Sequence, residues 1–331
     1  MDFSKRILPT SEKYIFSEEG YYVWCASIFK HKDSYYMAYS RWKKEYGFDS
    51  WVSQSQVCIA KSDSLFGTFR HVKVILPFGD ENDWDAHCAH NPTVMKYGDT
   101  YYLYHMANRG TGEFWNHRNN QRIAVAYTKD PEGEWKKADR PVIDVSEHGI
   151  DSLMTSNPSV VITPEQKVLM IYKAVSKEGV MPVGGNVICA AAIADNPIGP
   201  FRKFYSPLMS NPENPWSVED PFVWWERGKY YALVKDFQGY FSRGSKGSVA
   251  FFISEDGLEW KPAKNPLAFE RVLDFGSYKQ QVYRLERPQI YFEEGKARAL
   301  ICACMPLEGD CITYSIRIPL KEDEKTMVHQ Q

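Results

Sequence analysis

Hydrophobic and polar residues follow a pattern along this chain that recurs five times. Each copy starts at a small residue or proline, passes through three or four apolar residues to a short charged turn, and returns through an apolar, mostly aromatic-rich run. The copies start at Ala26, Pro92, Pro158, Pro221 and Pro288, spaced 66, 66, 63 and 67 residues apart. Two β-rich runs joined by a tight turn predict a β-hairpin. The sequence therefore predicts five hairpins at nearly constant intervals.

A second pattern runs in phase with the first. The apolar runs QVCIAKS, RIAVAYT, VICAAAIA and SVAFFIS each lead into a turn and an aromatic residue. Every repeat thus holds at least three strands, and we expect a fourth. Four-stranded sheets repeated five times predict an all-β fold, a five-bladed β-propeller, as a single catalytic domain over residues 1–331. Its blades should start near residues 22, 88, 154, 217 and 284; a β-sandwich is the alternative.

The two ends of the chain complete the predicted ring. The last repeat ends after a third strand, which the run from Asp310 to Leu320 supplies. We therefore expect the outer strand of the last blade to come from the N-terminal segment between Ile7 and Phe16.

This topology sorts residues between the two faces of the propeller. The short turns HKDS, KYGD, PEQK, ERGK and EEGK share one face and are typical structural turns. The other face collects the strand starts and four long polar loops, near residues 41–51, 108–120, 173–185 and 235–247. Long loops on one end of a rigid scaffold usually carry binding and catalysis.

The residues just before the five anchors should point to the central axis. They are Trp24-Cys25, His90-Asn91, Ser156-Asn157, Glu219-Asp220 and Glu286-Arg287. Charged side chains are rarely buried unless they are paired or functional. These positions are the strongest indication of a site in the sequence.

Charge and composition narrow the function. Lys and Arg total 40 against 42 Asp and Glu, for a net charge of −2, which argues against a nucleic-acid or anionic-membrane binder. No apolar run is long enough to span a bilayer. The N-terminal residues lack a signal-peptide core, so we expect a cytoplasmic location for the chain as written, or a periplasmic or secreted one if a precursor was processed. The seven Cys lie mostly in apolar runs and are expected to be buried thiols.

At Asn91-Pro92, Asn157-Pro158 and Glu219-Asp220-Pro221, the sequence resembles the five-bladed propeller glycosidases of glycoside hydrolase families 32, 43, 62, 68 and 117. The resemblance covers residues 20–318. It implies that Glu219 or Asp220 is catalytic, with Glu219 as general acid. The chain departs from family 43, whose first inner strand supplies an Asp-Pro base, because Val23-Trp24-Cys25-Ala26 has no carboxylate. The histidine-rich run DWDAHCAHNP is more similar to family 117, for which a histidine acid has been proposed.

Several residues are candidates for the catalytic groups. Because adjacent residues of a strand point to opposite sides, only one of Glu219 and Asp220 is expected to face the cavity well. His90 is a candidate proton donor or sugar ligand. The candidate bases are Asp85, Asp151, Asp236 and Glu286. Asp85 is the first choice, since it lies near two histidines in the loop entering the second blade.

The residues expected to bind the sugar lie at the strand starts and in the long loops. They are Trp24, Arg41, His87, Asn91, Asn157, Lys173, Lys235, Asp236, Glu286 and Arg287. The cations among them either neutralise the catalytic carboxylates or bind an anionic sugar. No glycine-rich loop opens a helix, so no organic cofactor is expected. A Ca²⁺ or Zn²⁺ ion in the axial channel is an alternative that the pattern does not mark.

We therefore expect an exo-acting, inverting glycoside hydrolase that cleaves O-glycosyl bonds and releases a terminal sugar from a plant or algal oligosaccharide. Glu219 would protonate the leaving oxygen and Asp85 would activate water. The alternatives are a carbohydrate-binding propeller without activity, a polysaccharide lyase on the same scaffold and, least favoured, a protein-interaction propeller. No nucleic-acid or membrane partner is expected, and the sequence does not indicate an oligomeric state.

Overall fold

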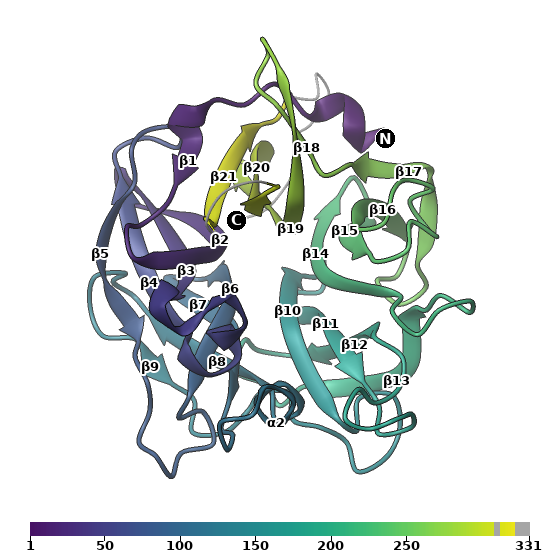
Figure 1. Cartoon of the computed structure of the whole chain (residues 1–331). Coiled ribbons are helices and arrows are strands. Elements are labelled where there is room, and N and C mark those ends of the chain that lie inside the picture. Colours follow the sequence, from purple (N-terminus) through teal and green to yellow (C-terminus); the bar gives the residue numbers. More distant parts are fainter. Residues whose placement is uncertain (308–311, 322–331) are drawn as a thin grey trace.

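Five β-sheets surround a central axis in this protein (Figure 1). The computed structural model describes residues 1–307 and 312–321. Each sheet runs from an inner strand at the axis to an outer strand at the rim, and neighbouring strands are antiparallel. The predicted five-bladed β-propeller is confirmed. Asp310 and Cys311, at the start of the predicted last strand, lie outside the described residues.

Each of the first four blades contains four strands in sequence order. Blade 1 is β2 (Tyr21–His31), β3 (Ser34–Lys43), β4 (Gln56–Ser62) and β5 (Arg70–Leu76). Blade 2 is β6 (Cys88–Tyr97), β7 (Thr100–Asn108), β8 (Arg122–Thr128) and β9 (Lys136–Lys137). Blade 3 is β10 (Met154–Ile162), β11 (Val168–Val175), β12 (Ile188–Ala194) and β13 (Arg202–Met209). Blade 4 is β14 (Val218–Glu226), β15 (Lys229–Asp236), β16 (Ser248–Ser254) and β17 (Lys261–Phe269).

Blade 5 joins the two ends of the chain. It contains β18 (Val272–Asp274), β19 (Lys279–Glu293), β20 (Lys296–Pro306), β21 (Tyr314–Pro319) and β1 (Ile15–Phe16). The inner strand β19 begins earlier than the residue 284 expected from the sequence, because its first residues form a hairpin with β18. Two short α-helices, α1 (Trp51–Gln54) and α2 (Phe114–Asn119), lie in the loops of blades 1 and 2.

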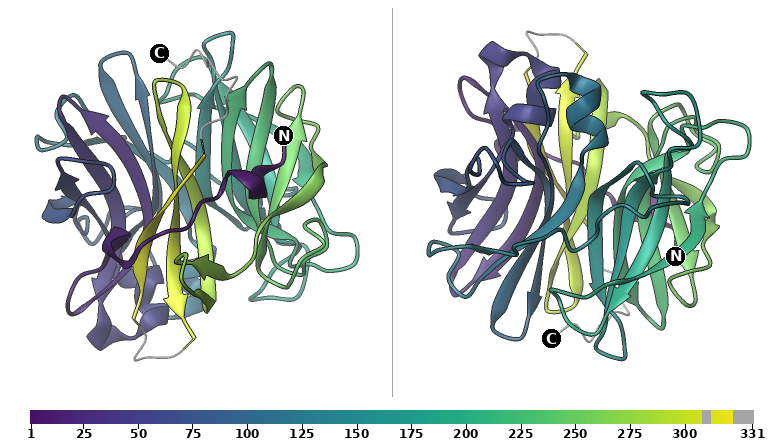
Figure 2. Two further views of the ribbon diagram at one scale, coloured as in Figure 1. Left: turned by 90° about the horizontal axis from the view of Figure 1, so that it is seen from above. Right: turned by 90° about the horizontal axis from the view of Figure 1, so that it is seen from below.

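The N-terminal segment closes the ring as predicted. Ile15 pairs with Ile316 of β21, and Ile7 forms a further bridge to Leu320 (Figure 2, left). Phe3 is fully buried and its ring lies 6.0 Å from that of Trp224 in blade 4. The segment therefore crosses the outside of blade 5 and contacts the neighbouring blade as well.

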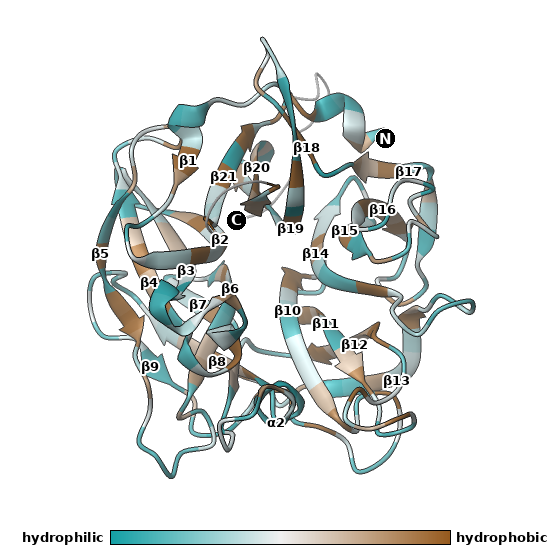
Figure 3. Ribbon diagram, in the orientation of Figure 1, coloured by the Kyte–Doolittle hydropathy of each residue, from teal (hydrophilic) through white to brown (hydrophobic). Residues whose placement is uncertain are grey.

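Hydrophobic clusters fill the space between each pair of adjacent blades. Alternate residues of a strand point to opposite faces of its sheet. In β15, Leu233 packs into the cluster shared with blade 5, whereas Ala232 and Val234 pack into the cluster shared with blade 3. Both faces of β15 are buried, which explains its run of apolar residues from Tyr230 to Val234. Hydrophobic segments lie mainly on the strands of the blades, and hydrophilic ones mainly in the loops (Figure 3).

The two faces of the propeller differ as the sequence predicts. Two-residue turns join β14 to β15 in blade 4 and β19 to β20 in blade 5, and each has both central residues at positive φ: Arg227-Gly228 at 52° and 77°, Glu294-Gly295 at 50° and 71°. Such type I′ turns match the twist of the flanking strands. The long loops and both α-helices gather at the other end. None of the described helices has the length and apolar character required to cross a membrane.

Candidate active site

All five inner strands carry the same irregularity at the axis. Each pairing register shifts beside the repeat anchor, and the residue before the anchor has a positive φ between 50° and 58°. These residues are Cys25, Asn91, Asn157, Asp220 and Arg287. A bulge of this kind breaks the strict alternation of a strand. The expectation that only one of Glu219 and Asp220 faces the cavity is therefore wrong: Glu219, Asp220 and Glu286 each offer a carboxylate oxygen within 4.8 Å of the others.

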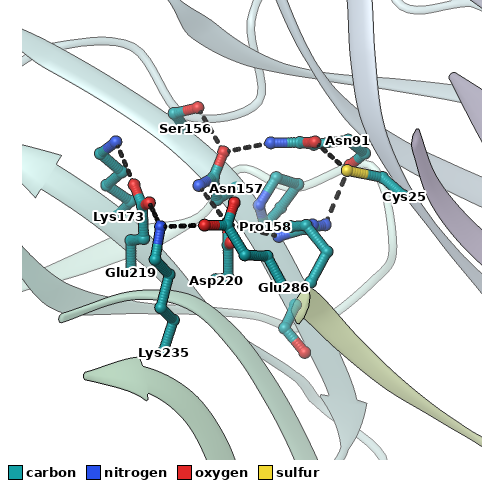
Figure 4. Close-up of polar contacts among 12 residues, drawn as sticks. Cys25, Asn91, Ser156, Asn157, Pro158, Lys173, Glu219, Asp220, Lys235 and Glu286 are labelled. Atoms are coloured by element: carbon teal, nitrogen blue, oxygen red, sulfur yellow. Dashed lines mark hydrogen bonds and ion pairs between the residues drawn. The ribbon is translucent and has the colours of Figure 1, made fainter. Parts of the chain in front are cut away.

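Side chains at these bulges meet at the axis (Figure 4). The Cys25 thiol donates to Asn91 Oδ1 at 2.5 Å, and Asn91 Nδ2 donates to Asn157 Oδ1 at 2.6 Å. Asn157 Nδ2 in turn donates to Asp220 Oδ1 at 2.6 Å. Arg287 completes the ring, since its Nη1 lies 3.7 Å from Asp220 Oδ1 and its Nη2 donates to the Asn91 carbonyl at 3.2 Å. We call these five residues the axial ring; all of them are buried.

Glu219 lies between two lysines. Lys173 Nζ is 2.6 Å from Glu219 Oε2, and Lys235 Nζ is 2.8 Å from Glu219 Oε1. The strand pairing fixes this arrangement, because Glu219 of β14 is the cross-strand partner of Lys235 in β15. Burial acts to raise the pKa of Glu219, but the two ammonium groups outweigh it and hold that pKa well below its usual range. Glu219 is therefore a carboxylate at neutral pH.

Lys235 links two of the acids. Its Nζ also lies 2.6 Å from Glu286 Oε1, and Arg284 Nη1 lies 3.5 Å from the same oxygen. Burial disfavours the ammonium, yet the surrounding carboxylates, Glu219 first, raise the pKa of Lys235 above its ordinary value. The lysine therefore stays charged.

Asp220 has the opposite environment from its neighbour in sequence. Burial and then the charge of Glu219 raise the pKa of Asp220 to about 7, although Arg287 acts to lower it. Near neutral pH this carboxyl group can hold a proton. Two adjacent acids with pKa values pushed apart are typical of a site that divides acid and base roles.

His90 lies against an aromatic wall beside the ring. Its Nδ1 is 2.8 Å from Ser55 Oγ, and its ring stacks on Trp51 with centroids 5.0 Å apart. Burial, helped by Arg287, lowers the pKa of His90 well below its ordinary value, so the imidazole is neutral. Trp24 belongs to the same wall but is only 5% exposed, with its ring 5.5 Å from that of Phe48.

Two of the predicted bases are paired with lysines at the rim of the propeller. Asp85 Oδ2 lies 2.8 Å from Lys137 Nζ in β9, the outer strand of blade 2. Asp151 Oδ2 lies 2.7 Å from Lys203 Nζ in β13, the outer strand of blade 3. The structure brings neither carboxylate into the group formed by Glu219, Asp220 and Glu286.

Three other residues predicted for the site make their contacts outside the acidic cluster. They are Asp236, His87 and Arg41. Asp236 is fully buried and accepts hydrogen bonds from the backbone N–H groups of residues 238, 239, 241 and 242. His87 Nδ1 accepts from the Gly110 N–H at 3.0 Å. Arg41 Nη1 pairs with Glu18 at 2.5 Å, and the guanidinium lies over the ring of Tyr21.

Two arginines near the carboxylates, Arg118 and Arg284, were not predicted from the sequence. Arg118 of α2 is buried and donates from Nη1 to the Val183 carbonyl at 2.9 Å, which joins two long loops. Burial lowers the pKa of Arg118 to about 10, and the charge of Glu219 acts in the opposite direction. Arg284 lies over the ring of Phe48, 5.4 Å from its centroid. The only signal for Arg118 was its position in the predicted long loop at residues 108–120.

The acids of the cluster do not fit a Ca²⁺ or Zn²⁺ site. Calcium takes six to eight oxygen ligands, and zinc favours imidazole and thiolate. In the described part of the chain, the acidic group at the axis holds Glu219, Asp220 and Glu286, and Lys235 already bonds two of them. An ammonium group therefore occupies the position that a cation would need.

A cavity of about 1020 Å³ lies on the other side of the axial ring. Residues beyond the bulges of all five inner strands line it, among them Phe29, Met95, Val161, Phe222 and Phe292. Its wall includes none of the three clustered acids. We therefore assign the candidate active site to the long-loop side of the ring, where the carboxylates lie.

No family model matches this sequence, and no curated protein matches it. Solved structures do resemble it. A protein named simply as a glycoside hydrolase is similar with a TM-score of 0.70 and 14% identity, over 99% of this chain and 96% of that one. A thermostable family-43 glycoside hydrolase is similar with a TM-score of 0.66 and 16% identity, over 98% of each chain. Zg3597, a family 117 glycoside hydrolase from the marine bacterium Zobellia galactanivorans, is similar with a TM-score of 0.66 and 17% identity, over 95% of this chain and 90% of that one. The chain therefore shares the five-bladed propeller fold of glycoside hydrolases of families 43 and 117.

Proposed function

We propose that this protein is a glycoside hydrolase whose reaction takes place at the Glu219 cluster. One observation carries the proposal: the ionised Glu219, held between Lys173 and Lys235, lies beside Asp220, whose pKa is raised to about 7. Glycoside hydrolysis needs one carboxylate and one protonated carboxyl group on either side of the scissile bond. The fold shared with named glycoside hydrolases supports the same reaction class.

The environments of the two acids suggest their roles. Glu219 was expected to be the general acid, but a group that two lysines keep ionised is better suited to attack or stabilise the anomeric carbon. Asp220 is the acid that can hold a proton near neutral pH and deliver it to the leaving oxygen. Glu286 would keep Lys235 in place through the 2.6 Å ion pair.

The separation of the acids supports retention of configuration. Retaining enzymes have carboxyl groups about 5–5.5 Å apart, whereas inverting enzymes leave about 6.5–9.5 Å for a water molecule. The clustered acids have oxygens within 4.8 Å of one another. Retention is therefore favoured over the inversion expected from the sequence.

The closed end of the axis supports exo-action. Asn91, Asn157 and Asp220 bond to one another across the axis, so a sugar would reach Glu219 from the long-loop side alone. The bond from Arg118 to the Val183 carbonyl ties two of those loops together. Such a site would accept the end of an oligosaccharide, and we propose that the enzyme releases a terminal sugar from a plant or algal oligosaccharide.

The test is a screen of wild type and Glu219→Gln against plant and algal oligosaccharides, with released monosaccharide read by chromatography. The matched control is Glu226→Gln: Glu226 is in the same strand, is 1% exposed and lies 3.7 Å from Arg6, but belongs to the far end of β14. Release by wild type and Glu226→Gln but not by Glu219→Gln supports the proposal. Equal release by all three would remove Glu219 from the mechanism, and binding without release would indicate a carbohydrate-binding propeller.

A further inference from the structure

More cations than acids surround the Glu219 cluster. The three acids are Glu219, Asp220 and Glu286, and Asp220, whose pKa burial raises to about 7, is partly protonated at neutral pH. Four cations lie within 4 Å of one of these acids: Lys173, Lys235, Arg284 and Arg287. A fifth, Arg118, is near enough for the charge of Glu219 to oppose the lowering of its pKa by burial. Buried charges are normally paired, because burial without a counter-ion is costly. The site therefore lacks negative charge.

Arg118 is the clearest case of an unbalanced cation. Its side chain belongs to a residue that is 4% exposed, and no carboxylate lies within ion-pair distance of it in the described part of the chain. Its Nη1 bonds to Asn119 and to the Val183 carbonyl, whereas Nη2 is buried without a hydrogen-bond partner among the described residues. Leaving a buried charged donor unsatisfied is unfavourable, and Glu219 is close enough to affect the titration of this arginine.

The other two arginines are each paired with one acid of the cluster, Arg287 with Asp220 at 3.7 Å and Arg284 with Glu286 at 3.5 Å, but both also carry N–H groups without a hydrogen-bond partner among the described residues. Arg287 is 2% exposed, and its Nε and Nη1 make no hydrogen bond within the described residues. The Nε of Arg284 is likewise buried and without a partner there. Guanidinium groups with free N–H groups are suited to carboxylate and sulfate, which accept charge-assisted hydrogen bonds.

We propose that the sugar bound beside Glu219 carries an anionic group, a carboxylate or a sulfate, and that Arg118 Nη2 binds it. This inference rests on the proposed function, because it names the substrate class of the same site. The anion supplies the negative charge that the cluster lacks, and a neutral sugar would leave Arg118 unsatisfied. The substrate is thus an acidic oligosaccharide with a uronic acid or a sulfated sugar at its end.

The test compares each ligand with a neutral form of itself. Uronate-containing and sulfated oligosaccharides are titrated into wild type by calorimetry, beside the same oligosaccharides after carboxyl reduction or desulfation. We expect the acidic form to bind roughly tenfold to a hundredfold more tightly, the usual worth of a hydrogen bond to a charged group. Preference for the uronate pair or the sulfate pair identifies the anion. Equal affinity for acidic and neutral forms, or binding of neither, would overturn the inference.

Two substitutions assign the preference to Arg118. Arg118→Gln should lose most of the preference for acidic over neutral ligands. Arg118→Lys, which keeps the charge and is the less disruptive change, should retain part of that preference. Arg317→Gln is the matched control: Arg317 is 1% exposed, burial lowers its pKa to about 10, and it donates to the Leu65 and Gly67 carbonyls from blade 5. A preference for acidic ligands that survives in both Arg118 variants would remove Arg118 from the binding site.

This inference and the proposed function can fail separately. Tight binding of acidic ligands without sugar release would keep the anion site and exclude hydrolysis. Efficient release from neutral oligosaccharides, with no preference for acidic ones, would keep the hydrolase and overturn the anion site.

Discussion

Lys235→Met removes the ammonium group that links two acids of the site. In the wild type its Nζ lies 2.8 Å from Glu219 and 2.6 Å from Glu286, and the side chain is 8% exposed. Methionine keeps the length and the apolar stem but leaves both carboxylates without this cation. Breaking a buried ion pair by removing one partner typically costs about 3–5 kcal/mol. For 331 residues at about 2.1 cal/mol/K each, this corresponds to a fall in Tm of about 4–7 °C.

The loss should depend on pH. In the wild type the pKa of Glu219 lies below its unfolded value, so its ionisation stabilises the protein at neutral pH, and this stabilisation is lost as the pH falls below about 4.5. Without Lys235, the pKa of Glu219 rises, and a proton then relieves part of the repulsion at pH 5 but not at pH 8. The difference in Tm between wild type and variant should therefore be larger at pH 8 than at pH 5.

Thermal denaturation followed by circular dichroism at the two pH values measures this difference. Lys203→Met is the control, because Lys203 is 14% exposed and pairs at 2.7 Å with Asp151 at the rim. Both variants should lose stability, but only Lys235→Met should also lose sugar release. An unchanged Tm at pH 8, or the same difference at both pH values, would refute the linking role of Lys235.

Three further substitutions test the neighbouring groups. The stability of Asp220→Asn relative to the wild type should be higher at pH 8 than at pH 5. The pKa of Asp220 is raised to about 7, so the stability that its protonated form gives the folded protein is lost as the pH rises through that value. Equal differences in Tm between variant and wild type at the two pH values would contradict this environment. Asn157→Ala should cost about 2–4 kcal/mol in urea unfolding, since it removes three side-chain hydrogen bonds and places Ala at a φ of 50°, and Asn157→Gly should cost less; an equal loss in both variants would exclude backbone strain. Asp236→Ala should make residues 237–247 more sensitive to limited proteolysis, because the Asp236 carboxylate accepts hydrogen bonds from several backbone N–H groups of this loop. An unchanged cleavage rate would exclude a role of Asp236 in holding the loop.

The repeat predicted which residues lie at the axis of the propeller, because equivalent positions of the repeat fall at equivalent positions of the five inner strands. Equal spacing of the anchors placed Asn91, Asn157 and Asp220 at equivalent positions, and the structure joins them by hydrogen bonds. What the repeat did not reveal was the bulge at each position, since the residues in the left-handed region are Cys, Asn, Asp and Arg rather than glycine. For that reason the joint orientation of Glu219 and Asp220 was missed.

Loop residues were harder to predict because their partners come from distant parts of the chain. Asp85 was favoured for its two neighbouring histidines, but its carboxylate bonds to Lys137, 52 residues later. Arg41 was predicted to face the sugar, but it pairs with Glu18 near the N-terminus. Arg118 had no distinguishing pattern, and only its burial near Glu219 marks it as a candidate.

The anomeric configuration of the first product tests the central claim most directly. Proton NMR spectra recorded immediately after enzyme is added to a cleaved oligosaccharide distinguish the two anomers before mutarotation mixes them. The close spacing of Glu219, Asp220 and Glu286 predicts that the released sugar keeps the configuration of the substrate. A product of inverted configuration would contradict a reaction carried out within this cluster and would require a base farther from Glu219.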